Sequence, residues 1–186
     1  MPGFFFRPVD LSSLALFFVA ALVGWRLWTL RPRTSAVSWL RLFFAASALF
    51  ALASIVASAR LDHWQFYAVH LQVAFSALGV AALLQYVYRV GDVDLDDIEA
   101  RAVWYLSLAA LAYIFGWAFY QFGQLNPAGN PSTSTAISEG LTALGLVWTL
   151  VVALRQARLA ARQPLRPGGR RSLGMLIAGV LLLLLA

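Results

Sequence analysis

"AVSWLRLFFAASALFALASIVASA", residues 36–59, decides the fold class of this chain. Arg41 is the single charged residue in the stretch. A helix of about 20 apolar residues crosses the roughly 30 Å hydrocarbon core of a bilayer, so the stretch is long enough to span a membrane. Its apolar residues run continuously, whereas those of barrel strands alternate with polar ones. The stretch therefore predicts a transmembrane α-helix.

The composition of the whole chain agrees with a membrane-embedded fold. Of the 186 residues, 61% are hydrophobic and 12% are charged, whereas soluble domains carry about 25% charged residues. The net charge of +6 would suit a nucleic-acid partner, but the arginines that supply it lie between apolar runs. We therefore expect the lipid bilayer, and no nucleic acid, to be the main partner. The chain has no cysteine, which excludes disulfides and thiolate metal sites.

Six runs are apolar enough to be membrane-spanning, and together they predict one all-α transmembrane helical bundle over residues 1–186. The predicted spans are 11–30, 36–59, 64–88, 102–122, 136–154 and 172–186, with a cytoplasmic linker over 155–171. The last run has 15 residues and would extend only about 22 Å as a helix. We therefore expect the last span to be incomplete and the protein to continue past Ala186, with seven spans in the whole molecule.

The arginines predict the orientation of the bundle. Twelve of them lie in or beside the connections after the first, third and fifth spans, and two, Arg7 and Arg60, lie on the other side. Positively charged connections stay in the cytoplasm. The pattern predicts a multi-pass protein of a bacterial inner membrane with its N-terminus outside and its arginine-rich loops in the cytoplasm.

Three stretches carry a resemblance to a known class of protein. They are "SWLRLFFAASALFALASIVAS" (38–58), "HWQFYAVHLQVAFSALGVAALLQYVYRVG" (63–91) and "RPGGRRSLGMLIAGVLLLLL" (166–185). Together with the predicted orientation, they resemble the seven-transmembrane N-terminal sensor regions of bacterial histidine kinases and related signalling proteins. The resemblance implies a sensory input module coupled to a cytoplasmic effector. It is a pattern of helices, so it carries over no functional residue.

Aromatic and polar residues on the outer half of three predicted helices are candidates for a ligand site. On the fourth span they follow three- and four-residue spacing, which places them on one helix face. On the third span, Tyr67 and His70 lie at a similar depth. The candidates are Tyr67, His70, Tyr113, Trp117, Tyr120, Gln121 and Glu139. They would line a pocket for an apolar or aromatic ligand, and ordinary packing between helices is the alternative.

The histidines of this chain are few, and the sequence gives little sign of catalysis or metal binding. The two histidines, His63 and His70, share one helix face because they are seven residues apart. They cannot bracket one haem iron, so a helix–helix hydrogen bond is favoured for His70. No catalytic motif is present in the sequence. We expect no enzyme activity, no catalytic residue, no metal site and no cofactor.

The connection "RVGDVDLDDIEARA" (89–102) holds five of the eight acidic residues. A divalent cation site or a docking surface is one interpretation of this cluster. The favoured interpretation is a solvated turn whose acids lie at the positive N-terminal end of the next helix. An EF-hand loop is excluded, because the sequence lacks glycine and glutamate at the required positions.

Three functions fit these observations. The first is a sensory or signalling input module, working as a homodimer and coupled to an effector. The second is an accessory subunit of a larger respiratory, photosynthetic or transport complex, which would bind partner helices through broad apolar faces. The third is a small transporter, which would show inverted repeats and helices broken near the midplane.

Overall fold

The structure, a computed structural model, describes residues 8–29, 34–58, 63–89, 97–124 and 133–162. These residues form five helices: α1 (Pro8–Thr29), α2 (Ser35–Ser58), α3 (His63–Arg89), α4 (Asp97–Gln124) and α5 (Thr133–Arg162). All five are long and apolar enough to cross a membrane. The all-α prediction is therefore confirmed over the described residues, and the protein is a multi-pass membrane protein. The predicted sixth span, 172–186, lies outside the described residues, and six or seven helices stay a prediction.

Two predicted connections are shorter than expected. Residues 155–162, predicted to begin a linker, continue α5 as helix, and residues 97–101, predicted to lie in a connection, begin α4. Arginine stems lie along apolar helix surface while the guanidinium reaches water, so a basic segment can extend a membrane helix beyond its apolar run. The rest of the predicted linker, 163–171, lies outside the described residues.

Local hydrogen bonds explain how polar side chains fit into these helices. The Thr34 hydroxyl accepts a hydrogen bond from the Val37 backbone N–H at 3.3 Å and so caps the start of α2. Inside the helices, serine and threonine hydroxyls donate to the carbonyl oxygen one turn earlier. Examples are Ser47, Ser54, Ser107, Thr142 and Thr149. Satisfied hydroxyls are cheaper to place in lipid than unpaired ones.

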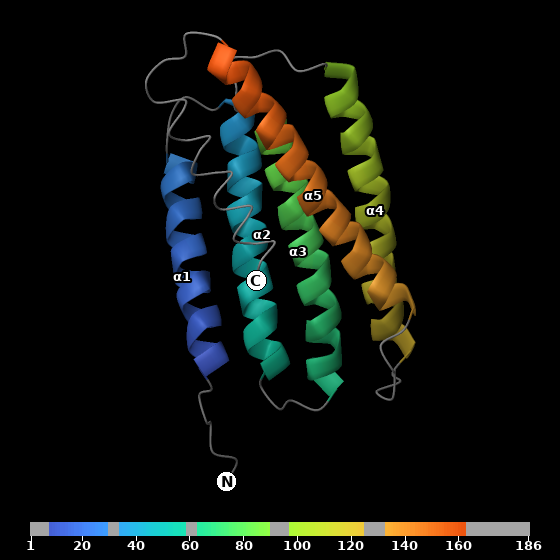
Figure 1. Ribbon diagram of the computed structural model, residues 1–186. Coiled ribbons are helices and arrows are strands. Elements are labelled where there is room, and N and C mark those ends of the chain that lie inside the picture. Colours follow the sequence, from blue (N-terminus) through green and yellow to red (C-terminus); the bar gives the residue numbers. More distant parts are fainter. Residues whose placement is uncertain (1–7, 30–33, 59–62, 90–96, 125–132, 163–186) are drawn as a thin grey trace.

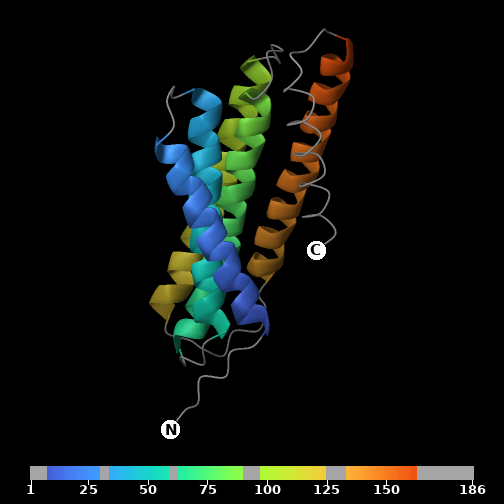
Figure 2. The same cartoon turned by 90° about the vertical axis from the view of Figure 1, so that its left-hand side faces the viewer.

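The helices run alternately up and down, and α3 lies at the centre (Figure 1). Helix α3 packs against α2, α4 and α5, whereas α1 packs against α2 alone among the described helices. Figure 2 shows α5 on one side of the bundle, tilted away from α1 and α2. The span of α3 is the most buried of the five and that of α1 the least. Helix α3 is therefore the axis around which the other described helices are arranged.

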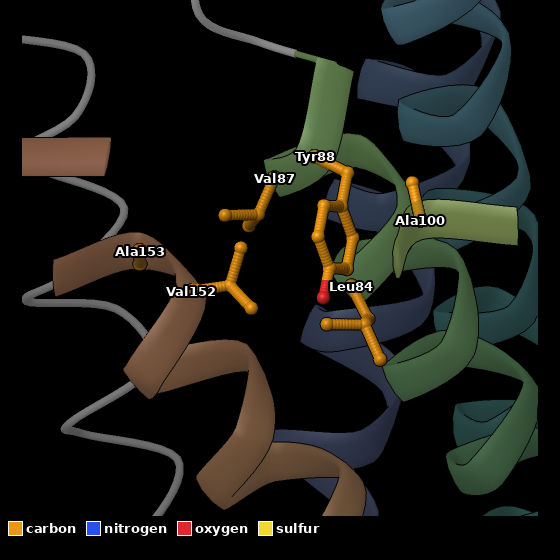
Figure 3. Close-up of a cluster of buried hydrophobic side chains, with 6 residues drawn as sticks. All are labelled: Leu84, Val87, Tyr88, Ala100, Val152 and Ala153. Atoms are coloured by element: carbon orange, nitrogen blue, oxygen red, sulfur yellow. The ribbon is translucent and has the colours of Figure 1, made fainter. Parts of the chain in front are cut away.

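Two clusters of buried apolar side chains join α3 to its neighbours. The first contains Leu84, Val87, Tyr88, Ala100, Val152 and Ala153. Figure 3 shows Val87 of α3 opposite Val152 of α5, with the Tyr88 ring between this pair and Ala100 of α4. The second contains Ala74, Ala77, Ala81, Leu111 and Ile114, between α3 and α4. Both clusters are rich in alanine, which lets membrane helices approach closely.

A glycine lies at a tight contact between α3 and α5. A Cβ placed on Gly145 would lie 2.8 Å from Cγ1 of Val80, which is shorter than real contacts allow. By contrast, a Cβ on Gly116 or Gly140 would meet nothing within 4 Å. Gly145 is therefore needed for packing, whereas Gly116 and Gly140 face open space.

Candidate functional site

The two ends of the bundle differ in chemistry. We call the end where α1, α3 and α5 finish and α2 and α4 begin the Arg89 end, and the opposite end the Tyr120 end (Figure 1). The sequence placed its candidate ligand residues toward the Tyr120 end. Most of the polar contacts between helices that the structure defines lie at the Arg89 end.

The carboxylate of Glu99 in α4 lies where three helices meet. Its Oε1 atom accepts hydrogen bonds from the Tyr88 hydroxyl of α3 at 2.9 Å and from Nη1 of Arg155 in α5 at 2.7 Å. The Tyr88 hydroxyl in turn accepts a bond from Nε1 of Trp148 at 3.1 Å. The Glu99 and Arg155 side chains are 26% and 43% exposed, so this ion pair lies at the edge of the bundle. We call these four residues the Glu99 cluster.

Gln85 extends the polar contacts into the bundle. Its side chain is fully buried. Its Nε2 atom lies 3.4 Å from the Ala100 carbonyl oxygen, and its Oε1 atom accepts a bond from Nη1 of Arg89. The Arg89 guanidinium lies over the Trp39 ring, 5.3 Å from its centroid. These contacts connect α2, α3 and α4 at the same end as the Glu99 cluster.

A second glutamine fixes α5 against α3. The Gln156 side chain is buried, and its Nε2 atom donates to the Val87 carbonyl oxygen at 3.3 Å. Burying a side-chain amide without a hydrogen-bond partner lowers the stability of the folded protein by about 1–3 kcal/mol. Gln85 and Gln156 therefore hold α3, α4 and α5 at a particular rotation, which apolar contacts alone would not select.

Sequence reasoning did not find the Glu99 cluster. The sequence favoured a solvated turn whose acids lie at the N-terminal end of the next helix, and Glu99 does lie there, in the first turn of α4. Its partial burial and its ion pair with Arg155 were not predicted. Asp92, Asp94 and Asp96 lie outside the described residues. One signal was available: Tyr88, Glu99 and Arg155 all fall at span boundaries on the same predicted side of the membrane. Their pairing still depends on how three helices are rotated, which the sequence does not give.

The candidate residues of α4 separate into two groups. Trp117 is partly buried, and its ring packs on that of Tyr120 with the centroids 5.4 Å apart. The buried indole N–H of Trp117 has no hydrogen-bond partner among the described residues. Tyr113 and Tyr120 are 41% and 55% exposed, so both reach the outer surface of α4. The side chain of Gln121 lies outside the described part of the chain.

The other candidates lie on α3 and α5. Tyr67 and His70 are partly buried in α3, and Glu139 is exposed near the start of α5. Among the described residues, no group of three histidines or carboxylates could hold a metal ion.

An apolar groove lies between α3, α4 and α5. It has a volume of about 50 Å³. Its lining consists of Ala77, Val80, Ala81, Leu84, Ser107, Ala110, Leu111, Ile114, Leu141, Thr142 and Gly145. The seven candidate residues are not among them. Trp117 and His70 nevertheless share helix faces with the lining, because they lie three residues from Ile114 and seven from Ala77.

No family model, curated protein or solved structure matches this chain. The function is therefore argued from the Glu99 cluster, the groove and the membrane-spanning helices themselves. In chemical terms, the cluster can hold α5 in place by charge.

Proposed function

We propose that this protein is a sensory or signalling input module, in which a shift of α5 against α3 and α4 is passed to an effector. The observation that carries the proposal is the Glu99 cluster, where one carboxylate of α4 binds side chains of both α3 and α5. A shift among packed helices is a common form of signalling transition.

Two attachments of α5 differ in strength. Near its middle, Gly145 packs closely against Val80 of α3. Arg155 lies ten positions further along the helix, which corresponds to about 15 Å, and is held by the ion pair with Glu99. A partly exposed ion pair contributes about 0.2–1 kcal/mol. The neighbouring Gln156 also holds this end of α5 through its hydrogen bond to the Val87 carbonyl oxygen. A stimulus that releases this end must therefore offset both contacts while the Gly145 contact stays in place.

The proposal can be tested by fusing residues 1–186 to a reporter kinase and measuring basal output. Glu99→Gln and Arg155→Gln each remove the ion pair, so both should change the output in the same direction. The exchanged variant, with Glu99→Arg and Arg155→Glu, should return the output toward the wild-type value. Arg26→Gln is the matched control, because Arg26 is an exposed arginine at the same end of the bundle on α1. Equal output from all variants at equal expression would refute the proposal.

The proposal includes a bacterial inner membrane with the Arg89 end in the cytoplasm. Its support is the concentration of arginines at that end. The chain has no cysteine, so single cysteines can be introduced and labelled with a membrane-impermeant maleimide. A cysteine at Thr34 should react only in inverted vesicles, and one at Asn130 only in intact spheroplasts. The reverse result would overturn the orientation.

One observation favours the accessory-subunit function as a second candidate. Helix α1 packs against α2 alone among the described helices, and Leu22, Trp25 and Trp28 are 71%, 72% and 66% exposed. In a complex, this face would contact helices of other subunits. Purification under mild detergent separates the two functions: a subunit brings different proteins in fixed stoichiometry, whereas a sensor brings copies of itself.

A further inference from the structure

Leu83 of α3 points between two helices that lie apart from each other. It lies four residues after Gly79, whose Cβ position is 3.8 Å from the Cβ of Ala46 in α2. It also lies four residues before Val87, which packs opposite Val152 of α5 (Figure 3). Residues four apart are neighbours on one helix face, so Leu83 faces the side of α3 between α2 and α5. Over their described residues, α2 and α5 have no Cα atoms within 8 Å of each other.

Burial on this side of α3 falls off along the helix. Val69, Ser76 and Leu83 follow one another at seven-residue spacing and share one face, which we call the Leu83 face. Val69 is 42% exposed, Ser76 is half-buried and Leu83 is only 7% exposed. Measured along α3 from Arg89, these residues lie at about 30, 20 and 9 Å, respectively. The cover of the Leu83 face therefore begins at the Arg89 end and stops short of Val69.

Described helices close the other two sides of α3 at this end. Between α2 and α4, the rings of Trp39 and Trp104 pack with their centroids 4.7 Å apart. Between α4 and α5, the Glu99 cluster joins both helices to α3. Among the described helices, none closes the side between α2 and α5. Leu83 is nevertheless buried within a single copy of the chain, which favours a cover that belongs to the same polypeptide.

One stretch outside the described residues has the length and composition to cover the Leu83 face. The stretches before and between the described helices, 1–7, 30–33, 59–62, 90–96 and 125–132, hold at most eight residues each. By contrast, residues 172–186 form a run of 15 without a charged residue and would extend about 22 Å as a helix. A cover of that length, starting at the Arg89 end, would pass Leu83 and Ser76 and would not reach Val69. The length of the run therefore matches the observed fall in burial.

The connection to α5 favours the same end of the bundle. Helix α5 finishes with Arg162 at the Arg89 end, and residues 163–171 lead from it to the apolar run. These nine residues span at most about 32 Å, whereas packed helices lie about 8–10 Å apart. The three arginines of this connection are costly to place in hydrocarbon. We therefore expect residues 172–186 to enter the bilayer at the Arg89 end, within reach of α3.

We propose that residues 172–186 pack along the Leu83 face, between α2 and α5, and run from the Arg89 end toward the Tyr120 end. The partner of this face is thus a segment of the same chain, antiparallel to α3. This direction places residues 177–180 at the depth of Leu83 and residues 182–185 at the depth of Ser76. The placement does not depend on the proposed signalling function, since a subunit of a complex would pack its own helices in the same way.

Disulfide formation between introduced cysteines tests the placement in the full chain, which has no cysteine of its own. Leu83→Cys is combined in turn with Ile177→Cys, Ala178→Cys, Gly179→Cys and Val180→Cys, because four consecutive positions cover a full helical turn. Native membranes are oxidised, and mass spectrometry of unreduced digests gives the linked fraction. At least one pair should be linked about fivefold more than the negative controls, because a disulfide needs Cβ atoms about 3.5–4.5 Å apart.

Matched controls are available on the described helices. Gly79→Cys with Ala46→Cys is the positive control, because the two Cβ positions are 3.8 Å apart. The negative controls combine Val69→Cys or Leu106→Cys with the same four partners. Val69 lies about 21 Å further along α3 than Leu83, and Leu106 is 71% exposed on α4. If the positive control is linked and no Leu83 pair exceeds the negative controls, side chains of α2 and α5 alone cover Leu83 and the proposal is wrong.

A second anchor tests the direction of the segment with little disturbance of the fold. Ser76→Cys replaces one oxygen atom by sulfur. It should be linked to a cysteine introduced within 182–185 and much less to one within 177–180. The opposite preference would overturn the proposed direction. Links that form only between differently tagged copies would assign the Leu83 face to a second copy of the chain and would also overturn the proposal.

Discussion

The Glu99 carboxylate of α4 and the Arg155 guanidinium of α5 meet at 2.7 Å, although 56 positions separate them along the chain. Tyr88 of α3 donates to the same oxygen atom. This relationship makes a single carboxylate the meeting point of three membrane helices. Its removal should therefore affect helix arrangement more than secondary structure.

The strength of this ion pair can be measured with a double-mutant cycle. Glu99→Gln, Arg155→Gln and the double variant should give a coupling free energy of about 0.2–1 kcal/mol, because both side chains are partly exposed. Chemical unfolding in detergent micelles, followed by circular dichroism, supplies the free energies. Raised salt should weaken the coupling. A coupling near zero at low salt would show that the pair does not hold α5.

Gly145 should tolerate no larger side chain. Gly145→Val would place a Cβ 2.8 Å from Cγ1 of Val80 and force α3 and α5 apart, which we expect to lower stability by about 1–3 kcal/mol. Gly140→Val is the matched control on the same helix, because nothing lies within 4 Å of its Cβ position. Thermal unfolding in detergent compares the two variants. Adding Val80→Ala to the Gly145 variant should restore part of the loss, and a failure to do so would place the strain elsewhere.

Gln85 should be required for the packing of α3 against α4. Gln85→Leu keeps much of the volume but removes the acceptor for Arg89 and the donor near the Ala100 carbonyl oxygen. Leaving buried polar groups unpaired should lower the free energy of unfolding by about 1–3 kcal/mol. Gln72→Leu, at a less buried position of the same helix, should have a smaller effect. Equal losses in the two variants would mean that the contacts of Gln85 contribute little.

The candidate ligand residues at the Tyr120 end can be tested one by one in the reporter-kinase fusion. Trp117→Phe removes the buried indole N–H that has no hydrogen-bond partner among the described residues. If a ligand accepts a hydrogen bond from this N–H, the variant should give a weaker response to the ligand. His70→Phe tests the candidate on α3. Tyr113→Phe should leave the response of the fusion nearly unchanged, because Tyr113 is 41% exposed on the outer surface. Unchanged responses in the Trp117 and His70 variants would end the hypothesis of a pocket at this end.

Helix positions were largely predictable from the sequence. The predicted span 64–88 falls within α3 (His63–Arg89), and 36–59 differs from α2 (Ser35–Ser58) by one residue at each end. The prediction was poorest where charged residues continue a helix, at 97–101 and 155–162. Hydropathy marks the thickness of the hydrocarbon core, whereas a helix can extend beyond it into the interface. Segment 172–186 shows the same apolar pattern but lies outside the described residues.

The sequence by itself determined that this protein lies in a lipid bilayer and which helices cross it, because the length of an apolar run is a local property of the chain. Only the tertiary structure decided which side chains face one another. The spans are apolar on nearly every side, so hydropathy does not distinguish a lipid-facing residue from one that faces another helix. The meeting of Tyr88, Glu99 and Arg155, and the close approach of Gly145 to Val80, follow from the rotation and tilt of packed helices. Packing in a bilayer sets that rotation through side-chain fit and buried hydrogen bonds, both of which join residues far apart in sequence.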